Sequence, residues 1–347
     1  MKIELGISTF GETTKLEESG IILSHDQRIR NLVEEIELAD KVGLDVYGIG
    51  EHHRDDFAVS NPEIVLAAGA VNTKNIKLTS AVTVLSSADP IRIYQNFSTV
   101  DALSSGRAEI MVGRGSFIES FPLFGYDLDD YETLFTEKLD MLLEIKDNEI
   151  LNWPGGRHTP KVDGKGVYPR AKNLDVWVGT GGSLNSTTDI ALRGLPIAYA
   201  ILGGGISGFK KIINLYRSVG LRANHPIENL KVAAHSWGYI ERNKEEAINK
   251  YYYPTKLVMD RIAKERSHWS ELTWDKYMHM VSDDGVMFVG DPETVAKKII
   301  RMIEELGLNR FLLHLPLGSM KHEDILECIR LFGEEVAPKV REYFKDR

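Results

Sequence analysis

The sequence is poor in cysteine, has no long apolar run and shows no cluster of basic residues. Its single cysteine, Cys328, cannot form an internal disulfide, and its helical spacing with Ile325 and Ile329 predicts a place in the core. No stretch approaches the roughly 18 apolar residues of a membrane span, and Glu4 stands where a signal peptide needs an apolar segment. We therefore expect a cytoplasmic protein with no membrane partner.

Basic charge is outnumbered by acidic charge. The formal net charge is −9, so a nucleic acid or an anionic membrane surface is not an expected partner. The histidines show neither the HxH nor the HExxH spacing of metal sites, and no metal is expected. The remaining composition, with 43% hydrophobic and 27% charged residues, is typical of a globular protein. A length of 347 residues fits two ordinary domains or one α/β barrel with insertions.

Predicted strands alternate with predicted helices along the chain. Helix starts are marked by a capping box at Ser24 and Gln27 and by cap-plus-proline pairs at 61–62, 89–90 and 291–292. Gly43 and Gly307 mark helix ends. Strands are expected at residues 3–10, 46–49, 76–85, 107–112, 175–178, 197–201, 230–240 and 310–315. Strands that alternate with helices in this way favour a (β/α)8 TIM barrel with insertions over a doubly wound sheet.

Two stretches interrupt the alternation. Residues 151–170 are rich in glycine, proline and histidine, which indicates an excursion away from the barrel core. Residues 243–285 combine charged clusters with several tyrosines and tryptophans, which indicates a helical insertion that acts as a lid or as a partner surface. We therefore expect residues 1–347 to form a single barrel domain with this insertion.

Sites in (β/α)8 barrels lie at the carboxyl ends of the strands. Candidate residues stand at the ends of all eight predicted strands, and we expect them to meet at one mouth. They are Ser8, Thr9, His52, His53, Leu85, Ser86, Arg114, 181–183, 203–205, His235, Trp237 and His314.

The segment GLDVYGIGEHHR, residues 43–54, ends a strand with two histidines. Strand alternation places Gly48, Gly50 and His52 on one face, and Tyr47 and His53 on the other. The glycine face leaves room for a flat group beside His52, whose imidazole suits acid–base work near neutral pH. For His53, a place in the core and a role in the site are equally compatible with the sequence.

The segment VGTGGSLN, residues 178–185, is a glycine-rich turn from a strand into a helix. Backbone N–H groups at the helix start, together with the hydroxyls of Ser183 and Ser186, would form a site for a phosphate-sized anion. A tight connection without a ligand is the alternative. Phosphate sites are common in the late loops of such barrels, which favours the anion site.

Arg114 follows another strand, in GRAEIMVGRGS at residues 106–116. Flanking glycines keep the backbone open around its guanidinium, which suits bidentate capture of a phosphate. An ordinary surface arginine is the alternative. Taken with the glycine-rich turn, Arg114 indicates a phosphate-bearing cofactor.

These and further segments resemble the bacterial-luciferase-like family of flavin-dependent monooxygenases over nearly the whole chain. The matching segments are EHH at 51–53, NPEIVLAAGAVNTKNIKLTSAVTVLSSADPIR at 61–92, VDALSSGRAEIMVGRGS at 100–116, FPLFG at 121–125, GTGGS at 179–183, ALRGLP at 191–196 and VGDPETVAKKI at 289–299. Their order and spacing are more specific than any one of them.

The resemblance implies a luciferase-like (β/α)8 barrel that uses reduced FMN as a co-substrate and molecular oxygen to oxidise a small organic substrate. By the same resemblance, His52 is similar to the family's catalytic histidine, and Arg114 to its phosphate-binding arginine. The phosphate position at the helix start corresponds to Gly181, Gly182, Ser183 and Ser186. Ala81 and Val82 match the position of a non-prolyl cis peptide behind the flavin ring.

The resemblance also implies partners and leaves alternatives open. A flavin reductase is a candidate partner, and a homo-oligomer, with a dimer as the expected form, is implied by analogy with the family. Some members use a deazaflavin and transfer hydride without oxygen, and the motifs do not separate the two cofactors. A non-catalytic flavin-binding protein is a third interpretation, which the presence of His52 disfavours.

Overall fold

The computed structural model of the chain describes residues 3–115, 117–203, 205–265 and 269–346. Its main sheet closes on itself because β9 pairs with both β8 and β10, which gives the ring β1-β2-β3-β5-β8-β9-β10-β12 with every pair parallel. These strands are β1 (Glu4–Thr9), β2 (Val46–Ile49), β3 (Lys77–Ser80), β5 (Ala108–Gly113), β8 (Asp175–Thr180), β9 (Ile197–Ala200), β10 (Val232–Ile240) and β12 (Arg310–His314). The predicted (β/α)8 barrel is confirmed.

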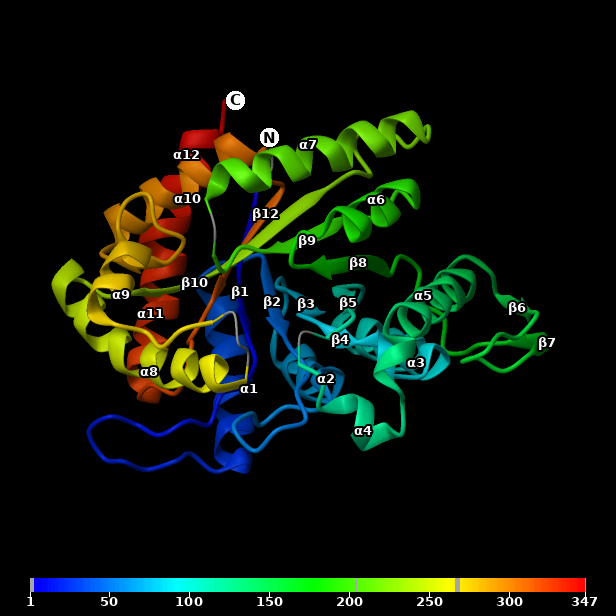
Figure 1. Cartoon of the computed structure of the whole chain (residues 1–347), viewed down its shortest axis with the longest axis horizontal. Helices are drawn as coiled ribbons and strands as arrows, with labels where there is room; N and C mark the ends of the chain where they lie inside the picture. Colours follow the sequence, from blue (N-terminus) through cyan, green and yellow to red (C-terminus); the bar gives the residue numbers. More distant parts are fainter. Residues whose placement is uncertain (1–2, 116, 204, 266–268, 347) are drawn as a thin grey trace.

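Helices return the chain from each strand to the next and cover the outside of the barrel (Figure 1). They are α1 (His25–Lys41), α2 (Pro62–Asn72), α3 (Pro90–Ser104), α5 (Tyr131–Asp147), α6 (Leu184–Leu192), α7 (Ile206–Arg222), α10 (Pro292–Leu306), α11 (His322–Leu331) and α12 (Ala337–Phe344). In the described ranges, no helix has the length and apolar character that a membrane span requires.

Strand alternation divides the core into two parts. A small cluster fills the barrel interior, with Val46, Met111 and Trp177 among its members. The large cluster lies between the sheet and the helices, where Tyr47 and Ile49 belong. Cys328 is fully buried in that outer cluster, as the sequence predicted.

The helix starts follow the predicted chemistry at three of four places. The side chains of Ser24, Asp89 and Asp291 accept hydrogen bonds from backbone N–H groups in the first helical turn. Asn61 makes no such side-chain bond, although α2 does begin at Pro62. The proline is compatible with the first turn because its missing N–H has no partner there in any helix.

Several element boundaries differ from the sequence prediction. The expected strand 76–85 is broken: β3 ends at Ser80, Ala81-Val82 is a cis peptide bond, and β4 (Thr83–Val84) follows with a short 3-10 turn, η1 (Leu85–Ser87). A further strand, β11 (Phe288–Gly290), pairs with the outer end of β10 and was not predicted. A π-helical turn, η3 (Phe332–Val336), lies between α11 and α12.

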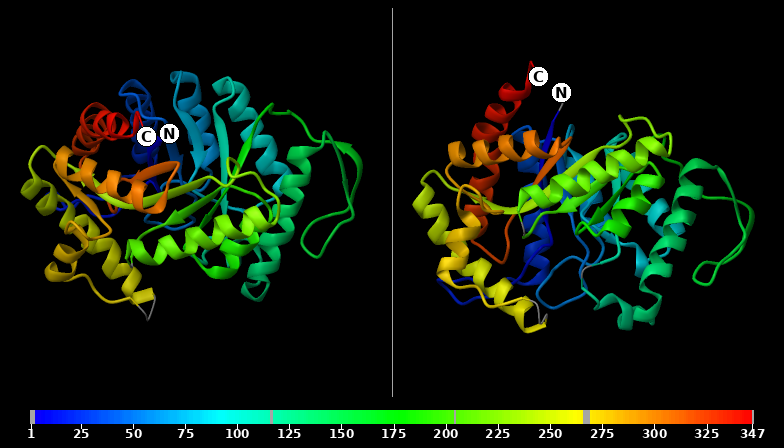
Figure 2. Two further views of the ribbon diagram at one scale, coloured as in Figure 1. Left: turned by 90° about the horizontal axis from the view of Figure 1, so that it is seen from above. Right: turned by 45° about the horizontal axis from the view of Figure 1, so that its top comes forward.

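The two interrupting stretches lie outside the ring of strands. Residues 150–166 form an antiparallel hairpin of β6 (Ile150–Trp153) and β7 (Val162–Gly166), which projects beyond the helices in all views (Figures 1 and 2). Two short elements, α4 (Ser120–Phe124) and η2 (Leu128–Asp130), precede α5. The 243–285 insertion contains α8 (Lys244–Glu265) and α9 (Trp274–Val281), and its residues 266–268 lie outside the described ranges.

Candidate active site

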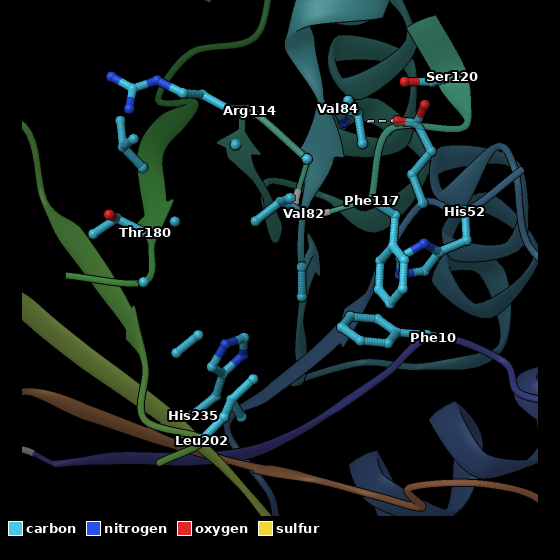
Figure 3. Close-up of a pocket in the computed structure, with 18 of the residues that line it drawn as sticks. Phe10, His52, Val82, Val84, Arg114, Phe117, Ser120, Thr180, Leu202 and His235 are labelled. Carbon is cyan, nitrogen blue, oxygen red and sulfur yellow. Dashed lines mark hydrogen bonds between the residues drawn. The ribbon is translucent and has the colours of Figure 1, made fainter. Parts of the chain in front are cut away.

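A cavity of about 560 Å³ opens at the carboxyl ends of the barrel strands (Figure 3). This volume lies within the range that holds a cofactor or a drug-sized ligand. Of the predicted site residues, the cavity is lined by His52, His53, Ala81, Val82, Arg114, Gly181, Ser183 and Ser186. The barrel therefore brings together residues from strands that are far apart in the sequence, whereas Gly182 is not part of the lining.

One end of the cavity has the features of an anion site. Ser183 caps α6 by accepting a hydrogen bond from the Ser186 N–H at 3.3 Å, and the two hydroxyl oxygens are 2.7 Å apart. Arg114 donates from Nη1 to the Ser186 hydroxyl at 2.7 Å. Its Nη2 lies 3.0 Å from the exposed Glu132 carboxylate, and its buried Nε has no partner in the described part of the chain. The positive end of a helix and a partly unsatisfied guanidinium thus face the same space.

The turn before α6 requires glycine at one position. Gly182 has φ +96°, which side chains rarely adopt, and its N–H donates to the Thr180 hydroxyl at 3.2 Å. This conformation directs the chain from β8 into the start of α6. Gly182 therefore shapes the anion site without lining the cavity.

The wall at Ala81-Val82 is built around two glycines. A Cβ atom on Gly113 or Gly179 would come within 2.7 or 2.6 Å of the Val82 side chain, closer than real Cβ contacts occur. Val82 therefore fits between β5 and β8 only because both positions lack a side chain. The Ala81-Val82 peptide is cis, in agreement with the expectation from the resemblance, and both residues line the cavity.

His52 stands on another wall of the cavity among aromatic rings. Its ring stacks on Phe57 at 4.2 Å and lies edge-to-face with Phe10 at 4.7 Å and Phe117 at 5.0 Å. Its Nδ1 is 3.1 Å from the Glu119 carboxylate. These contacts hold the imidazole in one orientation.

Glu119 is electrostatically matched to His52. Burial on its own raises the pKa of this carboxyl, but the hydrogen bond and the charge of His52 outweigh burial, and its pKa is lowered. The sequence analysis missed this residue because Glu119 lies in the loop after β5, separated from His52 by 67 positions. A carboxylate shortly after a strand end was the available signal.

The expected separation of His53 from His52 is wrong. β2 ends at Ile49, and beyond it the Glu51 N–H bonds to the Val82 carbonyl at 3.0 Å. The chain therefore leaves the strand before the histidines, so alternation no longer decides which way they face. His53 lines the same cavity, and its Nε2 lies 2.8 Å from Oε1 of Glu51. The other carboxylate oxygen of Glu51, Oε2, accepts a hydrogen bond from the Val84 N–H at 2.8 Å.

The other strand-end residues form a polar group beside the cavity. His314 lies 3.2 Å from the Ser8 hydroxyl through Nδ1 and 3.2 Å from Glu12 through Nε2. Thr9 donates to the other Glu12 oxygen at 3.3 Å. Glu12, which the sequence analysis also missed, lines the cavity and links the ends of β1 and β12.

Some expected positions lie away from the cavity surface. Leu85 and Ser86 are buried in η1, and Gly203 and Gly205 follow Leu202, which does line the cavity. Gly204 and Ser116 fall outside the described residues. Across the described ranges, no group of three or more His, Cys, Asp or Glu residues is arranged to hold a metal ion.

The fold and this site define a class: a (β/α)8 barrel with a cofactor-sized cavity at the mouth of the barrel. The family model for luciferase-like monooxygenases matches residues 3–310, so the chain belongs to that family and is a monooxygenase-type oxidoreductase. It is 24% identical to the alkanal monooxygenase alpha chain of Aliivibrio fischeri, with 96% of each chain covered. It is 23% identical to the N-acetyl-S-alkylcysteine monooxygenase of Bacillus subtilis, with 84% of this chain and 88% of that protein covered.

Solved structures share the architecture. A monooxygenase from Streptomyces bottropensis superimposes with a TM-score of 0.83 at 21% identity, covering 97% of this chain and 99% of that one. The oxygenating constituent of a Pseudomonas putida 3,6-diketocamphane monooxygenase in complex with FMN gives 0.77 at 20% identity, covering 98% and 99%. An F420-dependent secondary alcohol dehydrogenase gives 0.77 at 16% identity, covering 98% and 100%. At these identities the likeness concerns the fold alone.

Proposed function

We propose that this protein is an FMN-dependent monooxygenase that uses molecular oxygen to oxidise a small organic substrate. The observation that carries this proposal is the geometry of one cavity, in which Arg114 and the α6 start face one end and His52 stands on another wall. A cofactor with a phosphate at one end and a flat ring at the other matches this arrangement. Membership of the luciferase-like monooxygenase family supports the same chemistry.

The residues present fit FMN at the anion-binding end. The buried, unpartnered Arg114 Nε and the N–H groups of the α6 start offer donors for a phosphate. Ala81, Val82 and the glycines beside them provide a flat, apolar wall for a ring. When bound in its reduced form, FMN supplies the two electrons with which one atom of O2 enters the substrate and the other leaves as water.

The chain's own residues would contribute orientation, proton handling and exclusion of water. His52, held by Glu119 and three phenylalanines, can take or give a proton at its ring nitrogens. The phenylalanine rings also keep water away from the space around the imidazole. Arg114 would hold the phosphate of the cofactor at the opposite end of the cavity from this wall.

We propose that α8 and α9 cover the substrate side of the cavity. Val258 and Ile262 of α8 line it. The carboxyl end of α8 is tied to the loop after His52, because Arg54 bonds to Glu265 at 2.7 Å and Arg261 lies 3.0 Å from Asp56. One member of each pair, Glu265 or Arg261, is 41% exposed, so water competes for the contact and the pairs can open and close.

We also propose that the chain forms a homodimer through α2. This helix is apolar on almost every side, and Ile64 and Val71 on its outer face are 67% and 63% exposed. A second copy is the simplest partner for such a face, because a helix that is hydrophobic all round is normally buried. Ile64→Glu should shift the mass measured by light scattering from dimer to monomer, and a monomeric wild type contradicts this proposal.

A flavin reductase is proposed as the source of reduced FMN.

A deazaflavin-dependent oxidoreductase is the second candidate, because the F420-dependent structure superimposes as well as the FMN-bound one. The decisive experiment is to titrate the protein with FMN, riboflavin and F420, and then to mix the reduced complex with oxygen. We expect FMN to bind more tightly than riboflavin and the complex to consume oxygen. Equal affinity for riboflavin and FMN contradicts the phosphate site, and tighter binding of F420 with no oxygen uptake favours the second candidate.

A further inference from the structure

Strand β10 places two large side chains on the cavity wall. Its register pairs His235 with Ala200 of β9 and Leu312 of β12. Ala233 belongs to the barrel interior, so strand alternation directs His235 and Trp237 to the same inner side, and both line the cavity. Figure 3 shows the His235 ring directed towards the centre of the cavity, opposite the wall that carries His52 and Phe117.

His235 differs from the other histidines of the mouth in having no hydrogen-bond partner on Nδ1, which is buried, among the described residues. His52 is bonded to Glu119, His53 to Glu51, and His314 to Ser8 and Glu12. The His314 ring, 6.4 Å away between ring centres, is therefore already engaged. A buried polar nitrogen without a partner is unfavourable, and a ligand in the cavity is the group that could satisfy it.

The imidazole of His235 is neutral at physiological pH. Burial, with a smaller contribution from nearby His314, lowers the pKa of His235 to about 3. A neutral imidazole offers one hydrogen-bond donor, one acceptor and no charge. It can therefore orient an uncharged polar group, but it cannot compensate for the burial of an anion.

Apart from His314, which is bonded to Ser8 and Glu12, the His235 side of the cavity is mainly apolar. Leu202, Trp237, Val258, Ile262 and Leu317 line the same region of the cavity. Arg114 is the only arginine or lysine among the described residues of the lining, and it stands at the anion-binding end beside Ser186. An anionic substrate would find no counter-charge on the His235 side. An uncharged molecule would have only a small free-energy cost of desolvation there.

We propose that this side of the cavity binds an uncharged, largely apolar organic molecule with one hydrogen-bonding oxygen, and that His235 is the residue that holds this oxygen. The inference rests on the proposed function, because it takes the Arg114 end to be occupied by the cofactor. It goes further by assigning a substrate class and a specificity-determining residue. The hydrogen bond would fix which carbon of the substrate faces the reactive ring.

The test compares ligands of similar shape in the wild type and in His235→Phe, which keeps a ring and removes the nitrogens. The probes are cyclohexanone, methylcyclohexane and cyclohexanecarboxylate, with 2-octanone as a second ketone, each measured by calorimetry. We expect His235→Phe to weaken ketone binding about 2- to 13-fold, as for one ordinary hydrogen bond, and to leave methylcyclohexane unchanged. His235→Asn, which keeps a polar donor and acceptor, should recover part of the ketone affinity, and cyclohexanecarboxylate should not bind.

Three results overturn the proposal: an equal effect of His235→Phe on ketone and hydrocarbon, tighter binding of the carboxylate than of cyclohexanone, or no binding of either ketone. Each titration is run with and without saturating FMN, and thermal unfolding checks that both variants are folded. Failure of FMN itself to bind counts against the proposed function, whereas the titrations of the flavin-free protein still decide the role of His235.

Discussion

The two ends of the barrel differ in whether their buried polar and charged groups have partners within the chain. At the amino-terminal end, Arg310 is fully buried and donates to Glu4 at 2.6 Å and to Glu109 at 2.7 Å. Lys77 lies 2.9 Å from Glu4 and 2.8 Å from Glu109. Each of these charged groups is satisfied by another, so the network closes the barrel and leaves nothing for a ligand.

At the carboxyl-terminal end, polar atoms remain without partners in the described part of the chain. On the cavity lining they are Nδ1 of His235, Nε of Arg114 and Oγ of Ser120. Buried polar groups are normally hydrogen-bonded, so unsatisfied ones mark places where a ligand completes the structure. The fully paired network at the amino-terminal end therefore serves stability, and the unpaired groups at the carboxyl-terminal end serve binding, as expected for the two faces of such barrels.

The largest expected effect is on the closed network. Glu109→Gln leaves the buried Arg310 charge with only Glu4 as an ionised partner, and should reduce the free energy of unfolding by about 3–5 kcal/mol. Urea denaturation measures this loss. As a control, Asp26→Asn removes the exposed pair with Arg30 and should change stability far less. Equal effects of the two substitutions contradict the assignment.

Acid should weaken the same network. Burial raises the pKa of Glu109, but the charges and hydrogen bonds of Arg310 and Lys77 outweigh burial and lower it to about 2, against an ordinary value of 4.5. Because the folded-state pKa is the lower one, this carboxylate contributes its full stability above pH 4.5 and loses it as the pH falls towards 2. Between these pH values, the free energy of unfolding measured by urea denaturation should fall more steeply with decreasing pH for the wild type than for Glu109→Gln.

At the mouth, His52→Ala should act on the reaction rather than on folding. We expect the rate of product formation to fall by about 10²–10⁴-fold, the usual contribution of general acid–base catalysis, with FMN affinity largely kept. Stopped-flow mixing of the reduced enzyme with oxygen, with released hydrogen peroxide counted, measures the loss of coupling. His158→Ala, on a histidine that contacts Thr133 near the hairpin, is the matched control. If His53→Ala reproduces the loss and His52→Ala does not, the role belongs to His53.

Arg114→Ala should have a smaller effect, a loss of FMN affinity at the anion-binding end of the cavity. Loss of a charge-assisted contact with phosphate should cost about 1.5–3 kcal/mol, which is roughly tenfold or more in the FMN dissociation constant. Riboflavin, which lacks the phosphate, should bind the variant and the wild type equally. Arg157→Ala, on an arginine that is 73% exposed, should leave FMN binding unchanged. Fluorescence titration with both flavins measures the difference.

The smallest expected effect on stability concerns the ion pairs between α8 and the loop after His52. Glu265→Gln removes one of the two carboxylate partners of Arg54, which keeps Asp56, and should change the free energy of unfolding by less than about 1 kcal/mol. Trace protease should nevertheless cut α8 faster in this variant, and bound FMN should slow the cleavage. Hydrogen exchange in α8 as slow as in the barrel strands of both proteins contradicts a mobile cover.

The sequence by itself determined the elements that rest on local rules. Ser24 and Asp89 begin helices because their side chains accept the free N–H groups of the first turn. The apolar strand segments and the glycine-rich turn before Ser183 could be read in the same way, and together they predicted the barrel and the side on which its site lies. The prediction failed for His53, where alternation was applied beyond the end of β2.

Only the tertiary structure decided which groups meet. The pairing of Glu119 with His52, of Glu109 with Arg310, and the isolation of His235 depend on contacts between strands and loops that are far apart in the chain. No local pattern encodes such contacts, because closure of the barrel sets the distances at both of its ends. Closure therefore decides which buried polar groups find a partner within the chain and which are left for a ligand.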